Sequence, residues 1–475
     1  MIKWFPVLLL LFLPGRVWAV SDAFPPSVDP PTVAQFLSSP SNTYYCAPTG
    51  NNSTGDGSIG NPWIDLVGAT GTIVAGDLIY FRGGAYPDYE YRSGQSPSDS
   101  VVGQNHLGTS AVRVHGTAQY PIVITNYPNE IVTYDSIDQT WCLSLYGDHQ
   151  KLIGTKVGGE YGIQITGGVS WMADYMQVSG VEFISGTSNG GDLNPSMLTL
   201  NVNVASPGFT DATISHNYFH NSQHASAANR MAGIRFRLTQ NTIVEYNLFK
   251  DNLELSDCAA VYFKDTPLNA HIRYNTFVNN KDGVEYVTQW GATVPADGLY
   301  VYGNLFYDVG SNFTMRQETG ENFRFYNNVV LNIKAGGEFY YYNNTDEFYA
   351  NINDTSSYYD NIIGGTGFDE FFNGNSENNL PTYFDYNLWY LAGDRNQLDH
   401  WSDQGWHTNA VTANNVVTYD AGTHTVTVAD DYAGLGAGRY GGNIGGFTFL
   451  AGAPETATIN KVGSGTTGNS GATVQ

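Results

Sequence analysis

The pattern of hydrophobic and polar positions repeats along the middle of the chain. Each copy has a short alternating strand, then Asn, any residue and a large apolar residue. The copies are TISHNYFHNS (213–222), IVEYNLFKDN (243–252), HIRYNTFVNN (271–280), YVYGNLFYDV (300–309), RFYNNVVLNI (324–333), SYYDNIIGGT (357–366) and TYFDYNLWYL (382–391). Alternation with a period of two indicates β-strands, and a regular spacing of this length indicates a repeat architecture.

The repeat favours one fold class, an all-β right-handed parallel β-helix solenoid. No amphipathic helix separates the strands, so each period fits one coil, and coils stack about 4.8 Å apart. Equivalent residues then form ladders. We expect the repeated Asn side chains to pair along the stack in a turn, and an inward aromatic ladder of Phe219, Phe249, Phe277 and Phe306. A propeller or a sandwich is the alternative, which the single Asn-containing strand per period, without paired hairpin turns, disfavours.

The ends of the chain differ from this repeat. Lys3, an apolar stretch over 7–13 and the small residue Ala19 have the layout of a secretory signal peptide. We therefore expect residues 1–19 to be removed by cleavage near Ala19 and the protein to be secreted. Residues 20–40 are expected to be an N-terminal linker, 41–450 the β-helix domain and 451–475 a flexible C-terminal tail rich in Gly, Thr and Ser.

Composition narrows the set of partners. The net charge is −24 and only 13% of residues are charged, while Gly (54), Tyr (33) and Phe (24) are abundant. So acidic a chain is a poor partner for nucleic acid or an anionic membrane. We expect a monomer. Cys46, Cys142 and Cys258 have no metal-like spacing; they are either buried thiols or contain one disulfide, with one thiol left over.

A second set of short strands predicts a charged surface. They are GIRFR (233–237), AVYFK (260–264), GVEYV (283–287) and NFTMR (312–316). If the apolar residues face inward, two columns face outward. We expect one to contain Arg235, Tyr262, Glu285 and Thr314, and the next Arg237, Lys264, Val287 and Arg316. Three cations in one column repel one another, and a bound polyanion or nearby carboxylates would relieve this repulsion.

Other residues are candidates for contacts with a substrate. His220 and His224 lie where the chain leaves a repeat strand, and Trp290 follows Tyr286 in a loop, where a pyranose face can stack on it. Glu245 and Arg273 occupy equivalent positions on adjacent coils, which predicts a structural ion pair.

The segment VYFKDTPLNAHIRYNTF (261–277) resembles the active-site coil of the parallel β-helix polysaccharide lyases that include chondroitinase B and many alginate lyases. The resemblance is clearest over 259–280 and looser over 60–130 and 210–310. In that family a Lys at the end of this strand removes the C5 proton of a uronate, and Lys264 falls on its position.

The sequence departs from the family in two places. Val287 stands where the family has a catalytic Arg, so the resemblance leaves Arg316 or Arg237 to replace it. The family's two acidic calcium ligands correspond to Asp257 and Ala259, so calcium, the cofactor that the resemblance implies, would keep at most one of them.

Together these features predict a secreted enzyme that cleaves an acidic, uronic-acid-containing polysaccharide by β-elimination. Lys264 would be the base, Arg237 and Arg316 would bind carboxylate or sulfate, and Tyr262 or a His would be the proton donor. The residues expected to contact the substrate are Arg235, Glu285, Trp290, His220 and His224. A glycoside hydrolase on the same scaffold, using Glu285 and a second carboxylate, is one alternative. A non-catalytic carbohydrate-binding or surface β-helix protein is the other.

Overall fold

The structure is a computed structural model of the whole chain. It describes residues 28–86, 105–107, 113–135, 142–171, 173–184, 196–200, 210–222, 232–237, 239–253, 259–264, 268–287, 297–310, 313–317, 322–334, 337–342, 357–365, 368–373, 383–385, 387–391, 411–412, 417–428 and 437. The predicted signal peptide and C-terminal tail lie outside these residues. At some strand positions, Lys264, Val287 and Arg316 among them, only the backbone is described.

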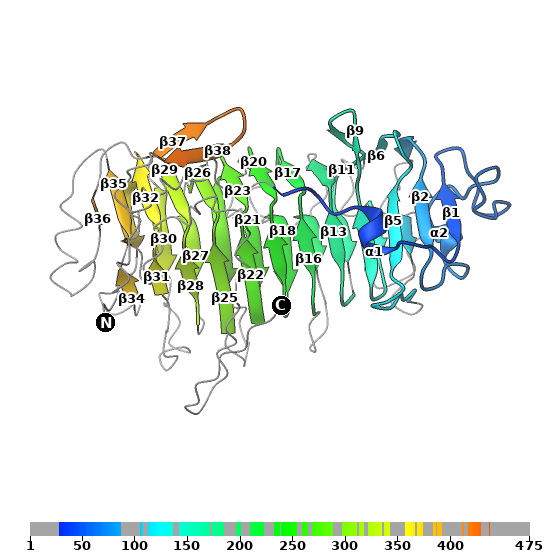
Figure 1. Ribbon diagram of the computed structural model, residues 1–475, viewed down its shortest axis with the longest axis horizontal. Coiled ribbons are helices and arrows are strands. Elements are labelled where there is room, and N and C mark those ends of the chain that lie inside the picture. Colours follow the sequence, from blue (N-terminus) through cyan, green and yellow to red (C-terminus); the bar gives the residue numbers. More distant parts are fainter. Residues whose placement is uncertain are drawn as a thin grey trace, which may run out of the picture.

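The described chain winds into a parallel β-helix with three long sheets (Figure 1). A typical coil passes from the first sheet to the second, then to the third, and then enters the first sheet again. The first sheet contains, in spatial order, β1 (Thr43–Cys46), β2 (Leu78–Phe81), β5 (Ile122–Asn126), β8 (Gln150–Ile153), β13 (Gln177–Ser179), β16 (Thr213–Ser215), β19 (Ile243–Glu245), β22 (Leu268–Arg273), β25 (Asp297–Tyr302), β28 (Arg324–Tyr326), β31 (Ser357–Tyr359) and β34 (Tyr383–Asp385).

The other two long sheets follow the same stacking. The second contains β3 (Gly84–Tyr86), β6 (Val132–Asp135), β11 (Ile163–Thr166), β14 (Val181–Ile184), β17 (Tyr218–His220), β20 (Leu248–Lys250), β23 (Thr276–Val278), β26 (Leu305–Val309), β29 (Val329–Ile333), β32 (Ile362–Gly365), β35 (Leu388–Leu391) and β36 (Val411–Thr412). The third contains β4 (Asn105–Leu107), β7 (Leu143–Leu145), β12 (Val169–Trp171), β15 (Ser196–Leu200), β18 (Ala232–Arg237), β21 (Ala259–Lys264), β24 (Asp282–Val287), β27 (Phe313–Gln317), β30 (Gly337–Tyr342) and β33 (Phe368–Asn373).

A two-residue turn joins the first sheet to the second in each of the repeated coils. Its first residue has a positive φ, as at His216 (57°), Tyr246 (55°) and Tyr274 (56°), and its second is the repeated Asn. Gly303 takes the first position one coil later, where a Cβ would come within 2.7 Å of the Tyr274 ring. The turn bends the chain from one sheet into the next in only two residues, so the strands on either side keep a fixed register.

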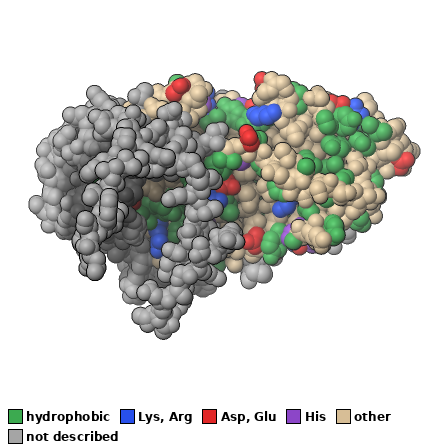
Figure 2. Space-filling model, viewed as in Figure 1, with side chains coloured by type: hydrophobic (Ala, Val, Ile, Leu, Met, Phe, Trp, Pro, Cys, Tyr) green, Lys and Arg blue, Asp and Glu red, His purple; other side chains and the backbone are tan. Residues whose placement is uncertain are grey.

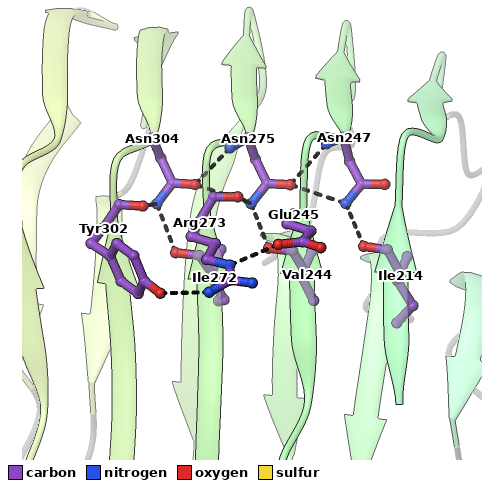
Figure 3. A network of polar contacts seen from close by, with 9 residues as sticks. All are labelled: Ile214, Val244, Glu245, Asn247, Ile272, Arg273, Asn275, Tyr302 and Asn304. Carbon is purple, nitrogen blue, oxygen red and sulfur yellow. Dashed lines mark hydrogen bonds and ion pairs between the residues drawn. The ribbon is translucent and has the colours of Figure 1, made fainter. Parts of the chain in front are cut away.

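The repeated Asn residues form the predicted ladder. Asn275 Oδ1 accepts from the backbone N–H and the side-chain amide of Asn247, each at 3.0 Å, and Asn275 Nδ2 donates to Asn304 Oδ1 at 3.0 Å (Figure 3). The same bonding joins Asn217, Asn247, Asn275, Asn304, Asn328, Asn361 and Asn387. Each of these amides is buried, so the ladder satisfies polar groups that would be costly to bury without partners.

The inward aromatic ladder is also confirmed. Phe219, Phe249, Phe277 and Phe306 stack with centroid separations of 4.6 to 4.9 Å and are completely buried, and Phe183 extends the stack by one coil. The predicted ion pair between Glu245 and Arg273 is present at 2.7 Å, and Arg273 Nη1 donates to the Tyr302 hydroxyl at 3.0 Å (Figure 3). These features rule out the propeller and the sandwich.

Two short helices and two hairpins of the described chain lie outside the three long sheets of the β-helix. Part of the expected linker forms α1 (Val33–Phe36), whose Val33 and Phe36 pack on an outward apolar cluster of the first sheet. At the N-terminal end, α2 (Leu66–Ala69) buries Leu66 and Ala69 against the core, with Asp65 as its N-cap. Two antiparallel hairpins lie outside the three sheets, formed by β9 (Lys156–Val157) with β10 (Glu160–Tyr161) and by β37 (Val417–Asp420) with β38 (Thr425–Val428).

Two of the three cysteines are described. Cys46 and Cys142 are thiols buried in the core, as the buried-thiol interpretation expects. Cys258 lies outside the described residues.

Candidate functional site

The outward face of the third sheet carries the first of the two predicted columns. Ile234, Val261, Val284 and Met315 are in register and fully buried in the core. Because side chains alternate along a strand, the residue that follows each of them faces outward. The resulting column, in register from coil to coil, is Arg235, Tyr262, Glu285 and Arg316.

This register corrects the sequence-based placement of Arg316. We expected Thr314 beside Glu285 and Arg316 beside Val287, but the Cα of Arg316 pairs with that of Glu285. The reason is that a shift of two residues keeps every apolar side chain of an alternating strand on the same face. The pattern in NFTMR therefore fixes which residues point inward but not which coil position they reach.

The second column keeps three of its predicted members. On adjacent strands, the Cα of Arg237 lies in register with that of Lys264, and the Cα of Lys264 with that of Val287. Arg237 is half-buried, and the side chains of Lys264 and Val287 lie outside the described residues. With coils about 4.8 Å apart and about 3.3 Å per residue, the Cα of Arg237 lies about 5 Å from that of Lys264, whereas the Cα of Arg316 lies about 12 Å from it.

The described members of the first column are well buried. Arg235 is 8% exposed, Tyr262 is 6% exposed and Glu285 is fully buried. The Arg235 guanidinium carbon lies 6.0 Å from the centre of the Tyr262 ring, at the outer limit of a cation–π contact, and Tyr262 packs against Ala232 and Ala259. Where water is scarce, charges act on one another more strongly than at an open surface. The column therefore places a phenol and a carboxylate between two arginine positions.

His220 lies on a different side of the β-helix. It ends β17 of the second sheet, where its Nε2 contacts Glu182 Oε1 at 3.0 Å and its ring stacks on Tyr218 at 4.0 Å. The structure therefore does not bring His220 together with Lys264. His224, Trp290 and Asp257 lie outside the described residues.

Sequence reasoning missed the surroundings of His220. The β9–β10 hairpin brings Tyr161 beside Tyr218, and Lys156 Nζ lies over the Tyr161 ring. Burial lowers the pKa of Lys156 and raises that of Tyr161 to about 12. The sequence contains no motif for this cluster, because a hairpin of two-residue strands leaves no periodic signal.

The described residues carry few charges on their visible surface. Figure 2 shows one face on which the described atoms are mainly uncharged, with scattered Lys, Arg, Asp and Glu side chains. Within the described ranges, no three His, Cys, Asp or Glu side chains are arranged to hold a metal ion. Helices in the same ranges are all too short or too polar to cross a bilayer.

Comparison with known proteins identifies the repeat. Residues 141–294 match the family model described as the right handed beta helix region. The match agrees with the predicted right-handed parallel β-helix over the coils where the third-sheet columns lie. No curated protein sequence matches the chain.

The solved structures similar to this chain include two lyases and a biosidase. A pectate lyase aligns with a TM-score of 0.44 and 13% identity, covering 72% of this chain and 80% of its own. An alginate lyase from Paenibacillus sp. aligns with the same score and identity, covering 70% of this chain and 98% of its own. A lacto-N-biosidase from Eubacterium ramulus aligns with a TM-score of 0.38 and 12% identity, covering 74% of this chain and 68% of its own. All three scores are below 0.5, so none of these likenesses carries an argument about activity.

Proposed function

We propose that this protein cleaves a uronic-acid-containing polysaccharide by β-elimination at the outward face of the third sheet. One observation carries the proposal. The backbone of β21 puts Lys264 and Tyr262 on the same face two residues apart, with Arg237 beside Lys264 and Arg235 beside Tyr262 on the neighbouring strand β18. This pairing gives a base, an acid and two cations to one short stretch of surface.

The proposed reaction uses these groups in one step. Lys264, as the neutral amine, takes the proton from C5 of the uronate. The electron pair of the C5–H bond forms the C4–C5 double bond, the C4–O4 bond breaks, and the leaving oxygen takes a proton from the Tyr262 hydroxyl. A carboxylate whose charge is neutralised makes the C5 proton more acidic, which is the task of a cation in such a site.

We assign that neutralising task to Arg237 rather than Arg316. The Cα of Arg237 is a direct neighbour of that of Lys264, whereas the Cα of Arg316 is two coils away and opposite Glu285. A guanidinium beside Lys264 also disfavours the protonated amine, which favours its action as a base. Arg235, Glu285 and Arg316 would then hold the sugars on either side of the cleaved bond.

Export and calcium are parts of the proposal that rest on sequence alone. The layout of residues 1–19 supports secretion of the mature chain. Asp257 is the remaining candidate ligand for calcium, and no step above uses the ion.

A product assay tests the proposal. The mature protein is incubated with polymannuronate, polyguluronate, polygalacturonate and a glucuronate-containing polymer, and two products are followed: new reducing ends and the ultraviolet absorbance of the unsaturated uronate. We expect both to rise together on at least one polymer. Lys264→Ala should lower the rate by about 10²- to 10⁴-fold, the usual contribution of a general base.

The controls separate the alternatives. Lys281→Ala removes a lysine that lies between the second and third sheets and outside the two columns, and it should leave the rate unchanged. Reducing ends without the unsaturated product would instead identify a hydrolase, in which Glu285→Gln should abolish activity. Neither product on any polymer, or full activity in Lys264→Ala, would refute the proposed elimination.

A further inference from the structure

A pocket on another side of the β-helix has no part in the proposed reaction. It has a volume of about 180 Å³ and lies between the turns that join the first and second sheets and the tip of the β37–β38 hairpin. His216, Tyr246 and Tyr274 line it from the turns, Leu248 and Thr276 from the second sheet, and residues 423–425 from the hairpin. Figure 1 shows this hairpin folded back along the body of the molecule beside β26 and β29.

Several contacts hold the walls of this turn pocket in place. Tyr419 of the hairpin stacks on Tyr307 of the second sheet at 3.6 Å between ring centres, and its hydroxyl is 2.9 Å from His424 Nδ1. On the other side, the ring of His216 stacks on Tyr246, and His216 Nε2 donates to the carbonyl of Val28 at 3.1 Å. The pocket is therefore assembled from three parts of the chain that are distant in sequence.

The lining is uncharged at neutral pH. Among the described residues that line the pocket, none is an Asp, Glu, Lys or Arg. Burial lowers the pKa of His216 and of His424, so both imidazoles are neutral, and burial raises the pKa of Tyr246 to about 12, so its phenol keeps its proton. The lining residues themselves therefore offer no counter-charge to an ionised ligand, and the charges of Glu245 and Arg273, which act on the Tyr246 phenol, are paired with each other.

The lining is nevertheless rich in hydroxyl groups. Tyr246, Tyr274 and Thr276 each contribute one, and none of these three hydroxyl groups has a hydrogen-bond partner among the described residues, although the backbone N–H groups of Tyr274 and Thr276 are bonded. A hydroxyl is both a donor and an acceptor, so these groups match a ligand that also carries hydroxyls. Leu248 adds an apolar surface suited to the C–H bonds of a sugar ring.

The first position of the two-residue turn, which Tyr246 and Tyr274 occupy, favours small residues. Tyr246 and Tyr274 have φ angles of 55° and 56°, a conformation in which a large side chain is disfavoured and Gly or Asn is usual. At the equivalent position one coil later, the chain has Gly303. A positive φ at this turn position is shared with His216, Asn327 and Asp360, so it belongs to the turn, and at Tyr246 and Tyr274 it sets two aromatic rings at the pocket wall.

We propose that this turn pocket binds one uncharged sugar residue. Its volume of about 180 Å³ has room for a single sugar ring. The pocket lies on the coils that also carry Arg235 and Lys264, but on a different side of them. It is therefore an anchoring site separate from the catalytic face, and it does not depend on the proposed elimination.

Ligand-observed NMR on the whole mature protein tests this proposal. The probes are methyl glycosides of glucose, galactose, mannose and xylose, the methyl glycoside of glucuronate, and glycerol, each at about 10 mM, where weak binding is detectable. We expect saturation transfer to at least one uncharged glycoside, weaker transfer to the glucuronate and none to glycerol.

Two variants and one matched control locate the binding. Thr276→Phe fills the pocket and Tyr274→Phe removes one hydroxyl, so we expect at least a tenfold loss of affinity in the first and a smaller loss in the second. Thr133→Phe introduces the same ring on the second sheet, far from the pocket, and should bind like the wild type. No transfer to any uncharged glycoside, equal transfer to glycerol, or unchanged binding in Thr276→Phe would overturn the proposal. Loss of elimination in Lys264→Ala with glycoside binding intact would show that the two sites are independent.

Discussion

Replacing Asn275 by Ala removes the middle member of the Asn ladder. The side chain is fully buried and takes part in five hydrogen bonds. Its Oδ1 is the acceptor for the backbone N–H of Asn247, which would be left without a partner. Its Nδ2 donates to the carbonyl oxygens of Val244 and Arg273 and to Asn304 Oδ1, at 2.8 to 3.0 Å.

The magnitude follows from the groups left behind. An unsatisfied buried N–H costs about 1–3 kcal/mol, and each lost hydrogen bond whose partner keeps another bond costs about 0.5–1 kcal/mol. The amide of Asn247 keeps its bond to Ile214 O, and Asn304 Oδ1 keeps its bond from the backbone N–H of residue 275. We therefore expect Asn275→Ala to lower the free energy of unfolding by about 3–7 kcal/mol, a large share of the stability of an ordinary domain.

Equilibrium unfolding in urea, followed by far-UV circular dichroism at neutral pH, measures this loss. The control is Asn61→Ala, because Asn61 is exposed and its side chain donates a hydrogen bond to the carbonyl of the exposed Thr54 at 2.9 Å. The control should lose less than about 1 kcal/mol. A loss of the same small size in Asn275→Ala would refute the reasoning, because it would mean that water replaces the ladder at little cost.

Three further predictions follow from single contacts. Phe277→Ala should cost about 3–5 kcal/mol in the same unfolding assay, because its ring is buried between two stacked rings; a loss below about 1 kcal/mol would contradict the packing. Burial, and then the charge of Arg273, lowers the pKa of His271 from 6.5 to about 4, so the folded state favours the neutral ring. The contribution of His271 to the free energy of unfolding is therefore complete above pH 6.5 and is lost as the pH falls to about 4. Because the side chain is partly exposed, we expect the loss to be about 1–2 kcal/mol. Urea unfolding measured across this pH range should show the loss in the wild type and not in His271→Gln. In the elimination assay Arg237→Ala should lower the rate at least tenfold more than Arg316→Ala, and the reverse order would move the carboxylate site to the Glu285 coil.

The scaffold was predictable because its determinants repeat. Asn recurs at the same position in seven copies and Phe in four of them, so the ladders through Asn275 and Phe277 follow from the sequence alone. The ion pair between Glu245 and Arg273 followed from the same alignment. Each of these predictions depends on aligning the seven copies of the repeated segment.

The columns of the candidate site were only partly predictable. Arg237 and Lys264 were placed correctly because the strands that contain GIRFR and AVYFK pair without a shift, as the aligned patterns predict. Arg316 was misplaced because alternation cannot distinguish a shift of two residues. The turn pocket could not be predicted at all, since it depends on how the β37–β38 hairpin docks more than 100 residues beyond Tyr307.

The invariant two-residue turn has a consequence for how this chain can change in length. Successive ladder Asn residues are separated by 30, 28, 29, 24, 33 and 26 residues, yet every one keeps the same bond to its neighbour. That variation must therefore be absorbed by the strands, which differ in length from coil to coil, and by the other two corners of the coil. Insertions made there can lengthen a single loop without disturbing the neighbouring coils. The turn that contains the ladder Asn thus keeps a constant length. The other two corners are the places where loops can be inserted to change what the molecule recognises.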